Sequence, residues 1–327
     1  MYQTGIANNV NDFLDKLKLY AETIGWTIHR HEVANINGGT SNGVWLQISN
    51  ADTGCFSFYS DSRVESETSN RHAYPKPQIY VAGETGSGDS DLIWEQPGST
   101  AKDSAMTNGL YGPFTYFLFG SNQYIHCIIE IRPGLFAHLG AGMLEKSGYD
   151  GGQYIFGTKH YCDIDSTNSN HGGNWTMSSH CWPFDSRGSS SVSTLIRLGS
   201  NWLKIGSSNS TKGYGWGPIR ADKAIYNNNG DRSPIGWLFD ASPNTLNSIT
   251  PLFPLLTYAQ DFQERGLLLG SPCDMRWCNI KNIVPGESIF IGQDEWVIFP
   301  IKAKVPEGNA PQGQYSSYLY GLAYKKL

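Results

Sequence analysis

The sequence is poor in charged residues, which make up 16% of its 327 residues, against about 25% in an average globular domain. No stretch approaches the roughly 18 apolar residues that span a bilayer, and Met1–Ile6 lacks the features of a secretory signal. We therefore expect a protein made in the cytoplasm, without membrane contact. The net charge of −5 leaves no broad basic surface, so no nucleic-acid partner is expected.

Cysteine is also scarce, and a chain of this length can bury a core without disulfide staples. We expect the cysteines to be reduced; they are Cys55, Cys127, Cys162, Cys181, Cys273 and Cys278. The sequence contains no Gly-x-Ser-x-Gly elbow, no phosphate-binding Gly-x-x-x-x-Gly-Lys-Ser/Thr loop and no His-Glu-x-x-His zinc helix. It therefore predicts no enzyme, no cofactor and no assigned catalytic, cofactor-binding or metal-ligating residue.

Several pairs of donor side chains could hold a metal, but none has a diagnostic spacing. His29 and His31 alternate in a strand-like register, which predicts that both imidazoles project from one face. Solvent-facing histidines explain the same spacing, and we favour that interpretation. The other pairs are His160 with Cys162, His180 with Cys181, and Cys273 with Cys278.

Four acids, Glu84, Asp89, Asp91 and Glu95, cluster in one aromatic-containing segment. Sugar hydrolysis needs two carboxylates across a cleft, but turn-forming acids among glycines explain the cluster better. His138, between apolar neighbours, is interpreted as a structural histidine.

What the sequence has in abundance is aromatic residues, 13% of the chain. One amphipathic helix is predicted near the start, because Val10, Phe13, Leu14, Leu17, Ala21 and Ile24 form one stripe. Asn8 or Asn9 caps it and Gly25 ends it. The helix is expected to pack by that face on a sheet beginning at Trp26.

The rest of the chain alternates short β-branched and aromatic runs with Gly, Asn, Ser or Pro, which is typical of strands. The predicted strands are Val44–Ser49, Cys55–Tyr59, Gln78–Ala82, Phe114–Gly120, Tyr124–Ile131, Gln153–Thr158, Leu195–Leu198, Trp202–Ile205, Gly236–Asp240, Leu252–Leu256, Ser288–Ile291, Trp296–Lys302 and Tyr318–Tyr324. Between Ile131 and Gln153, Pro133 and Gly151-Gly152 predict turns. We expect a mainly β protein, an antiparallel sandwich or barrel-like set of sheets with one N-terminal helix and long loops.

Long polar stretches interrupt the strands at Asp61–Pro77, Gly83–Gly109, Asp163–Ser191 and Ser207–Ser233. Such loops either bind a partner or form solvated surface. We predict a single domain over residues 1–327, in which residues 160–250 form a loop-rich insertion or subdomain.

The segment from Tyr124 to Lys146, Tyr-Ile-His-Cys-Ile-Ile-Glu-Ile-Arg-Pro-Gly-Leu-Phe-Ala-His-Leu-Gly-Ala-Gly-Met-Leu-Glu-Lys, resembles a stretch of uncharacterised virion structural proteins of tailed bacteriophages. The helix running into Gly25-Trp26, the Gly112-Pro-Phe-Thr turn, Thr250-Pro-Leu-Phe-Pro and Gly292-Gln-Asp-Glu-Trp-Val-Ile-Phe-Pro resemble the same family. The resemblance implies a particle component of the tail, neck or baseplate, located in the virion, without catalytic or metal residues to transfer.

Three functions follow as hypotheses, and the first is favoured. The protein is a structural subunit that contacts copies of itself and other phage virion proteins. Alternatively, it is a receptor- or carbohydrate-binding tail protein that stacks a host glycan on Trp94, Trp175, Trp182 and Trp216. The third hypothesis is a glycan hydrolase that uses Asp91 and Glu95.

Overall fold

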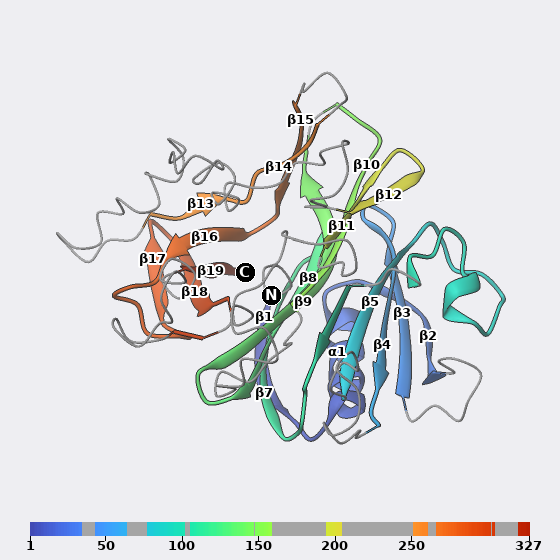
Figure 1. Cartoon of the computed structure of the whole chain (residues 1–327), viewed down its shortest axis with the longest axis horizontal. Helices are drawn as coiled ribbons and strands as arrows, with labels where there is room; N and C mark the ends of the chain where they lie inside the picture. Colours follow the sequence, from blue (N-terminus) through green and yellow to red (C-terminus); the bar gives the residue numbers. More distant parts are fainter. Residues whose placement is uncertain are drawn as a thin grey trace, which may run out of the picture.

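A computed structural model describes residues 1–34, 43–63, 77–101, 105–146, 148–158, 194–204, 251–260, 266–301, 303–304 and 320–327. In these residues the strands form three sheets, all of whose pairings are antiparallel, with one α-helix (Figure 1). None of the three sheets closes into a barrel within this part of the chain. The prediction of a mainly β, antiparallel, sandwich-like fold is confirmed.

The central sheet runs in the order β1-β7-β8-β9-β10-β11-β12, and β15, paired with β14, joins it at β9. Its strands are β1 (Tyr2–Ala7), β7 (Phe114–Gly120), β8 (Tyr124–Arg132), β9 (Leu135–Glu145), β10 (Gly151–Gly157), β11 (Thr194–Leu198), β12 (Asn201–Lys204), β14 (Thr257–Gln260) and β15 (Gly266–Pro272).

Two five-stranded sheets complete the fold. The N-terminal sheet comprises β2 (Thr27–Ala34), β3 (Gly43–Asn50), β4 (Gly54–Asp61), β5 (Gln78–Glu84) and β6 (Ala105–Asn108), in that order. The C-terminal sheet has the order β13-β16-β19-β18-β17. Its strands are β13 (Phe253–Pro254), β16 (Met275–Asn279), β17 (Ser288–Ile291), β18 (Asp294–Pro300) and β19 (Tyr320–Lys326).

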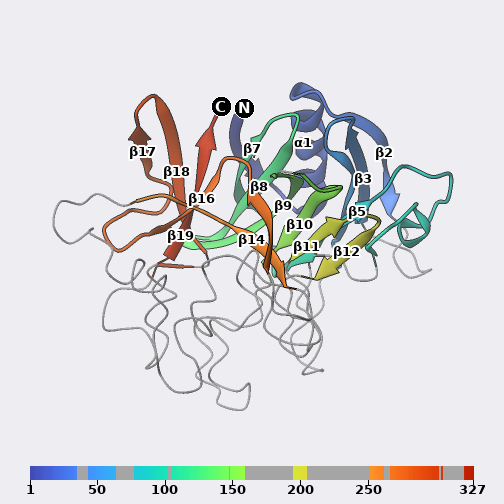
Figure 2. The same cartoon turned by 90° about the horizontal axis from the view of Figure 1, so that it is seen from above.

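The central sheet lies between the other two and is buried on both faces (Figures 1 and 2). Alternation along β8 shows how one strand serves two cores. Tyr124 and Ile128 pack in a cluster with residues of the C-terminal sheet. Ile125 and Cys127 pack in a second cluster with α1 and the N-terminal sheet. A strand buried on both faces needs a continuous apolar run, which is why the sequence around Tyr124 lacks polar alternation.

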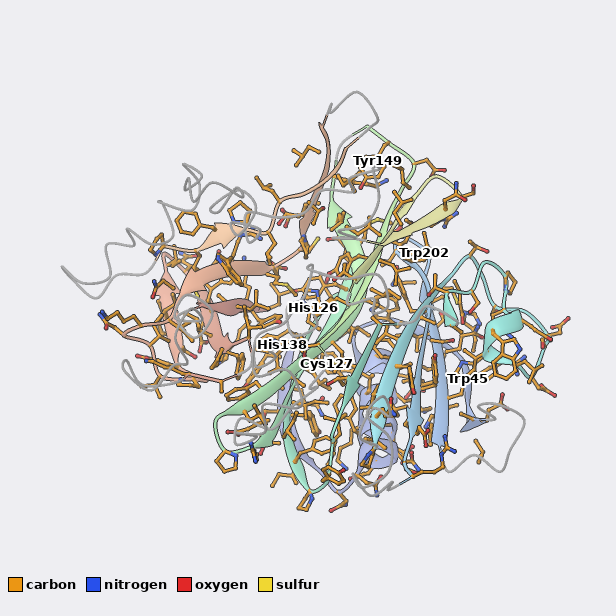
Figure 3. The ribbon with its side chains drawn as sticks, in the orientation of Figure 1. Trp45, His126, Cys127, His138, Tyr149 and Trp202 are labelled. Carbon is orange, nitrogen blue, oxygen red and sulfur yellow. The ribbon has the colours of Figure 1, made fainter. Side chains whose placement is uncertain are left out.

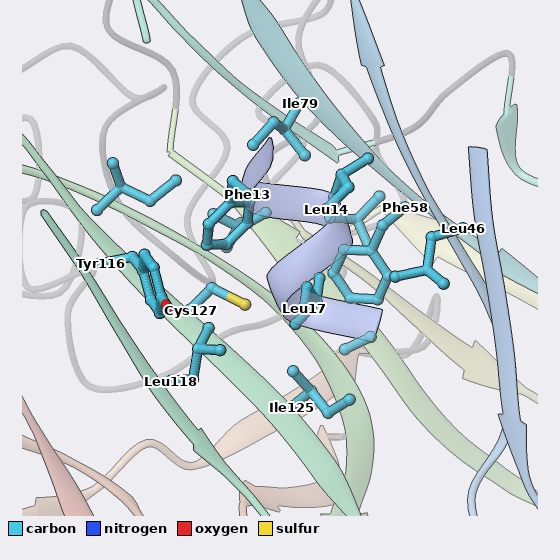
Figure 4. Packing of buried hydrophobic residues seen from close by; sticks show 14 of the residues in the cluster. Phe13, Leu14, Leu17, Leu46, Phe58, Ile79, Tyr116, Leu118, Ile125 and Cys127 are labelled. Carbon is cyan, nitrogen blue, oxygen red and sulfur yellow. The ribbon is translucent and has the colours of Figure 1, made fainter. Parts of the chain in front are cut away.

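The helix α1 (Val10–Thr23) fills the wedge between the N-terminal and central sheets (Figure 4). The predicted apolar stripe is confirmed, and Leu14 and Leu17 share a core cluster with Phe58 of β4. Phe13 also contacts the central sheet, with its ring centroid 5.6 Å from that of Tyr116 in β7. The helix therefore packs against two sheets, whereas the sequence predicts packing against one.

Asn9 caps α1, because its side-chain oxygen accepts hydrogen bonds from the backbone nitrogens of Asn11 at 2.9 Å and Asp12 at 3.0 Å. We expect Asn9→Ala to lower the free energy of unfolding by about 1 kcal/mol, since two amide groups lose their acceptor. Asn9→Asp retains the acceptor and is the matched control. Urea denaturation of both variants measures the difference, and equal losses would contradict a capping role.

The Gly-rich segment after Arg132 contains an 11-residue strand, β9, which the sequence analysis missed. Gly140 and Gly142 lie inside it, where a Cβ atom would meet the Ile125 carbonyl oxygen at 2.6 Å and the Tyr124 Cβ at 2.5 Å, respectively. Gly140 and Gly142 therefore leave room for close-packed neighbouring atoms, and they do not form a turn. The paired Gly151-Gly152 opens β10 instead of forming a turn.

Most other predicted strands are confirmed within one to a few residues at their ends. The prediction at Leu252–Leu256 is wrong in extent, since only Phe253–Pro254 forms a strand there. The structure adds strands that the sequence analysis did not identify, namely β1, β6, β14, β15 and β16. The strand predicted at Gly236–Asp240 lies outside the described residues. Within residues 160–250 the structure describes only residues 194–204, which contain β11 and β12.

The two ends of the chain lie beside each other where the central and C-terminal sheets meet (Figure 2). The Lys326 ammonium sits 4.7 Å from the ring centroid of Tyr2. No helix among the described residues combines the length and the apolar character needed to cross a bilayer.

Candidate functional site

In each of the three sheets, one terminal strand carries a large apolar side chain that is exposed. Phe290 and Ile291 of β17 are 70% and 49% exposed, and Val284, just before β17, is 66% exposed. Val33 of β2 and Ile6 of β1 are exposed as well, and both strands are terminal in their sheets. We call Val284, Phe290 and Ile291 the β17 edge. Natural edge strands are usually protected by charge or proline, and β17 carries neither.

Of the four tryptophans predicted to stack on a glycan, only Trp94 lies among the described residues. Trp94 lies in the short helix η1 (Ile93–Glu95) and is half-buried. Trp175, Trp182 and Trp216 lie outside the described residues. The described residues therefore supply one member of that set.

Three of the four clustered acids, Glu84, Asp91 and Glu95, each contact different residues rather than one another. Glu84 is buried, whereas Asp89 is exposed. Asp91 accepts a hydrogen bond from Arg30 at 3.3 Å, and Glu95 accepts one from Ser90 at 2.6 Å. The interpretation of Asp89 and Asp91 as loop acids agrees with these positions. Glu95 instead ends the short helix η1, and Glu84 ends the strand β5.

Glu84 is the centre of a buried polar cluster on the face of the N-terminal sheet opposite α1. Ser57 Oγ donates to Glu84 Oε1 at 2.6 Å, and Gln47 Nε2 donates to Glu84 Oε2 at 2.6 Å. Cys55 Sγ lies 3.4 Å from Glu84 Oε2. Burial raises the pKa of the Glu84 carboxyl, while the hydrogen bonds from Ser57 and Gln47 oppose that rise. Burial and the adjacent carboxyl raise the pKa of the Cys55 thiol.

The segment after β5 closes over this cluster, and Gln96 attaches it to the sheet. Gln96 Oε1 accepts from Gln47 Nε2 at 3.1 Å and from the Gly88 backbone nitrogen at 2.8 Å. Arg30 donates to the Gly88 carbonyl at 2.9 Å and lies over the Trp45 ring at 4.6 Å. Water is thereby kept from the carboxyl of Glu84, which is 1% exposed.

His29 and His31 do not share a face, so the geometric part of that prediction is wrong. The register of β2 against β3 shifts between Ile28 and Arg30, and a bulge interrupts the alternation of side chains. His29 Nε2 therefore meets Ser49 Oγ at 2.7 Å, whereas His31 Nε2 meets Asp15 Oδ1 of α1 at 2.9 Å. The two imidazoles cannot hold one metal ion together.

Two other histidines are fully buried between the central and C-terminal sheets (Figure 3). His138 of β9 contacts the Tyr324 hydroxyl at 2.8 Å through Nδ1 and the Pro300 carbonyl at 2.8 Å through Nε2. Because a carbonyl only accepts, Nε2 carries the proton and Nδ1 accepts from Tyr324. His138 thus links β9 to two strands of the C-terminal sheet, and these contacts agree with its interpretation as a structural histidine.

His126 of β8, unlike His138, has a hydrogen-bond partner for only one of its two ring nitrogens among the described residues. Its Nε2 lies 2.5 Å from the Tyr154 hydroxyl, and its ring stacks on Tyr124 at 4.4 Å. Its Nδ1 is buried and has no hydrogen-bond partner among the described residues. Burial lowers the pKa of His126 to about 3. Burial lowers the pKa of His138 to about 4, against the opposing effect of the Pro300 carbonyl.

Within the described ranges, no group of three or more is arranged to hold a metal ion. Cys55, Cys127, Cys273 and Cys278 are buried free thiols. The pairs His160 with Cys162 and His180 with Cys181 lie outside the described residues.

Sequence reasoning missed Gln47, Ser57 and His126. One signal was present for the first two, because polar and apolar residues alternate along β3 and β4, which places Gln47 and Ser57 on one face. Nothing in the apolar run around His126 distinguishes it from its neighbours.

A comparison with models of known protein families finds no match, and a comparison with curated proteins finds no relative of significant similarity.

Proposed function

We propose that the protein is a structural subunit of a tailed-bacteriophage particle, in the tail, baseplate or neck. In this role it makes repeated contacts with copies of itself and with other virion proteins. The proposal has two supports, the resemblance of the Tyr124–Lys146 segment and other landmarks to virion proteins, and the exposed apolar edges of the sheets.

The β17 edge is the observation that carries the proposal. In the described part of the chain, β17 pairs with β18 along one side, and no strand pairs with its other side. An exposed strand of this kind offers backbone donors and acceptors to a neighbouring chain, with Phe290 and Ile291 as apolar anchors. A modest contact repeated around a ring can close an assembly without a large apolar patch.

Phe290→Asp is expected to reduce incorporation of the protein into particles at least tenfold, because it places a charge in the contact. Leu19→Asp is the matched control, since Leu19 is 60% exposed on α1 rather than at a sheet edge. Light scattering gives the mass of each purified protein, and quantitative mass spectrometry of particles gives its copy number. Absence of the unsubstituted protein from particles would refute the proposal, and equal incorporation of both variants would refute the role of the β17 edge.

A further inference from the structure

Gln47, Ser57 and Glu84 come together from three neighbouring strands of the N-terminal sheet. Gln47 of β3 and Ser57 of β4 are directly opposite in register. Glu84 of β5 receives the serine hydroxyl on Oε1 and the glutamine amide on Oε2, each at 2.6 Å. One carboxyl therefore bridges a hydroxyl and a primary amide whose Cβ atoms lie within about 5.5 Å across the strands.

Three parts of an acyl transfer are present, namely a nucleophile, a proton carrier and a leaving group, whereas the Gln47 carbonyl oxygen has no hydrogen-bond donor among the described residues. The hydroxyl proton of Ser57 points at Glu84 Oε1, and Ser57 Oγ accepts from Trp45 Nε1 at 2.8 Å. One lone pair of Ser57 Oγ remains for attack on a carbonyl carbon. The Gln47 nitrogen, which would leave, already contacts the other carboxyl oxygen. Fixing a nucleophile, a proton carrier and a leaving group together supplies much of the barrier reduction in intramolecular acyl transfer.

We propose that Glu84 catalyses an ester cross-link between Ser57 and Gln47 within the N-terminal sheet. Glu84 Oε1 takes the Ser57 hydroxyl proton as Ser57 Oγ bonds to Gln47 Cδ. The bond between Cδ and Nε2 then breaks, and the carboxyl returns a proton to the departing nitrogen. The products are one ester and one molecule of ammonia, nothing is oxidised or reduced, and Glu84 is regenerated.

The surroundings of the cluster favour this step. Gln47 and Ser57 are fully buried and Glu84 is 1% exposed, so water competes poorly with the serine hydroxyl. The raised pKa of the Glu84 carboxyl suits a group that must both accept and donate a proton. Ammonia escapes into bulk solution, which draws the reaction forward. The cross-link would join β3 to β4 covalently and stiffen the sheet that supports α1.

The test is the mass of the purified, folded full-length chain. We expect an intact mass lower by one ammonia than the sequence requires. A succinimide at an Asn-Gly sequence also loses ammonia, so the position must be mapped. Trypsin leaves residues 31–63 as one peptide that holds both partners. Further cleavage before Asp52 separates Gln47 from Ser57 unless the ester joins the two fragments.

Three variants assign the roles. Glu84→Gln and Ser57→Ala are expected to abolish the joined fragments. Cys55→Ala is expected to retain them, which distinguishes the serine ester from a thioester on Cys55, whose Sγ also faces Glu84. An unmodified mass after prolonged incubation of the unsubstituted protein would overturn the proposal without reference to any variant. Loss of the joined fragments in Cys55→Ala but not in Ser57→Ala would replace Ser57 by Cys55 as nucleophile.

Discussion

Alanine at Gly140 or Gly142 is expected to lower the free energy of unfolding by about 3 kcal/mol, the upper part of the usual range for overpacking a core. A Cβ at Gly140 would lie 2.6 Å from the Ile125 carbonyl oxygen and 2.9 Å from the Phe156 ring. At Gly142 it would lie 2.5 Å from the Tyr124 Cβ and 2.8 Å from the Gln123 carbonyl oxygen. Backbone atoms cannot rotate aside, so β8 and β9 must separate.

Gly86→Ala is the matched control for both substitutions. Gly86 has no atom within 4 Å of an added Cβ, so its substitution should change stability by less than about 0.5 kcal/mol. Urea denaturation followed by tryptophan fluorescence measures all three variants. Similar stabilities for Gly140→Ala and Gly86→Ala would show that β9 is not packed as closely as described.

Acid is expected to destabilise the protein steeply, because His126 and His138 are held neutral in the folded chain. The pKa of His126 is about 3 and that of His138 about 4, whereas an unfolded histidine titrates near pH 6.5. As the pH falls from 6.5 towards these values, the unfolded chain binds protons that the folded chain does not. The loss of folding free energy is small above about pH 7, and each histidine removes about 2 kcal/mol by pH 5.

The groups that face these imidazoles do not compensate in that pH window. Burial raises the pKa of Tyr124, Tyr154 and Tyr324, which keeps the three hydroxyls uncharged in acid. The carboxyl of Glu84 acts in the opposite direction, because its raised pKa favours protonation of the folded chain. That contribution is shared by the unsubstituted protein and the histidine variants, so it cancels in their comparison.

His138→Gln separates proton binding from packing. Lost packing lowers the free energy of unfolding equally at every pH, whereas a lost titrating group changes its slope against pH. We expect the slope between pH 5 and 6 to fall by about 1.2 kcal/mol per pH unit in His138→Gln, and by twice that in the variant that also carries His126→Gln. Denaturation curves at several pH values provide the slopes. An unchanged slope would mean that His138 is protonated as readily in the folded chain as in the unfolded one.

The sequence predicts the buried strands well where their composition is distinctive. Tyr124–Ile131 is apolar apart from His126 and Glu130, a composition typical of a strand covered on both faces, and β8 occupies that position. It fails at β9, because Gly140 and Gly142 have low strand propensity and are selected by the space left by neighbours. Those neighbours, Tyr124 and Phe156, are identified only when the strands are paired.

In the candidate sites too, contacts between residues on different strands could not be predicted from local sequence. The acid cluster predicted around Glu84 joins residues that are neighbours in sequence, but the actual partners of Glu84 are Gln47 and Ser57, on other strands. The period-2 rule placed His29 and His31 together, and one bulge in β2 separated them. Phe290 is exposed on β17, and only the strand order identifies β17 as the last strand of its sheet.

By itself the sequence determined the features set by near neighbours in the chain. Helix α1 follows from the spacing of its apolar residues and from Asn9, whose side chain reaches amides two and three residues away. The mainly β class follows from short β-branched and aromatic runs. The tertiary structure decided which residues meet across strands, namely the Glu84 cluster, the two buried histidines and the β17 edge. Such contacts depend on strand order and register, which are fixed by the packing of three sheets together rather than by any local pattern.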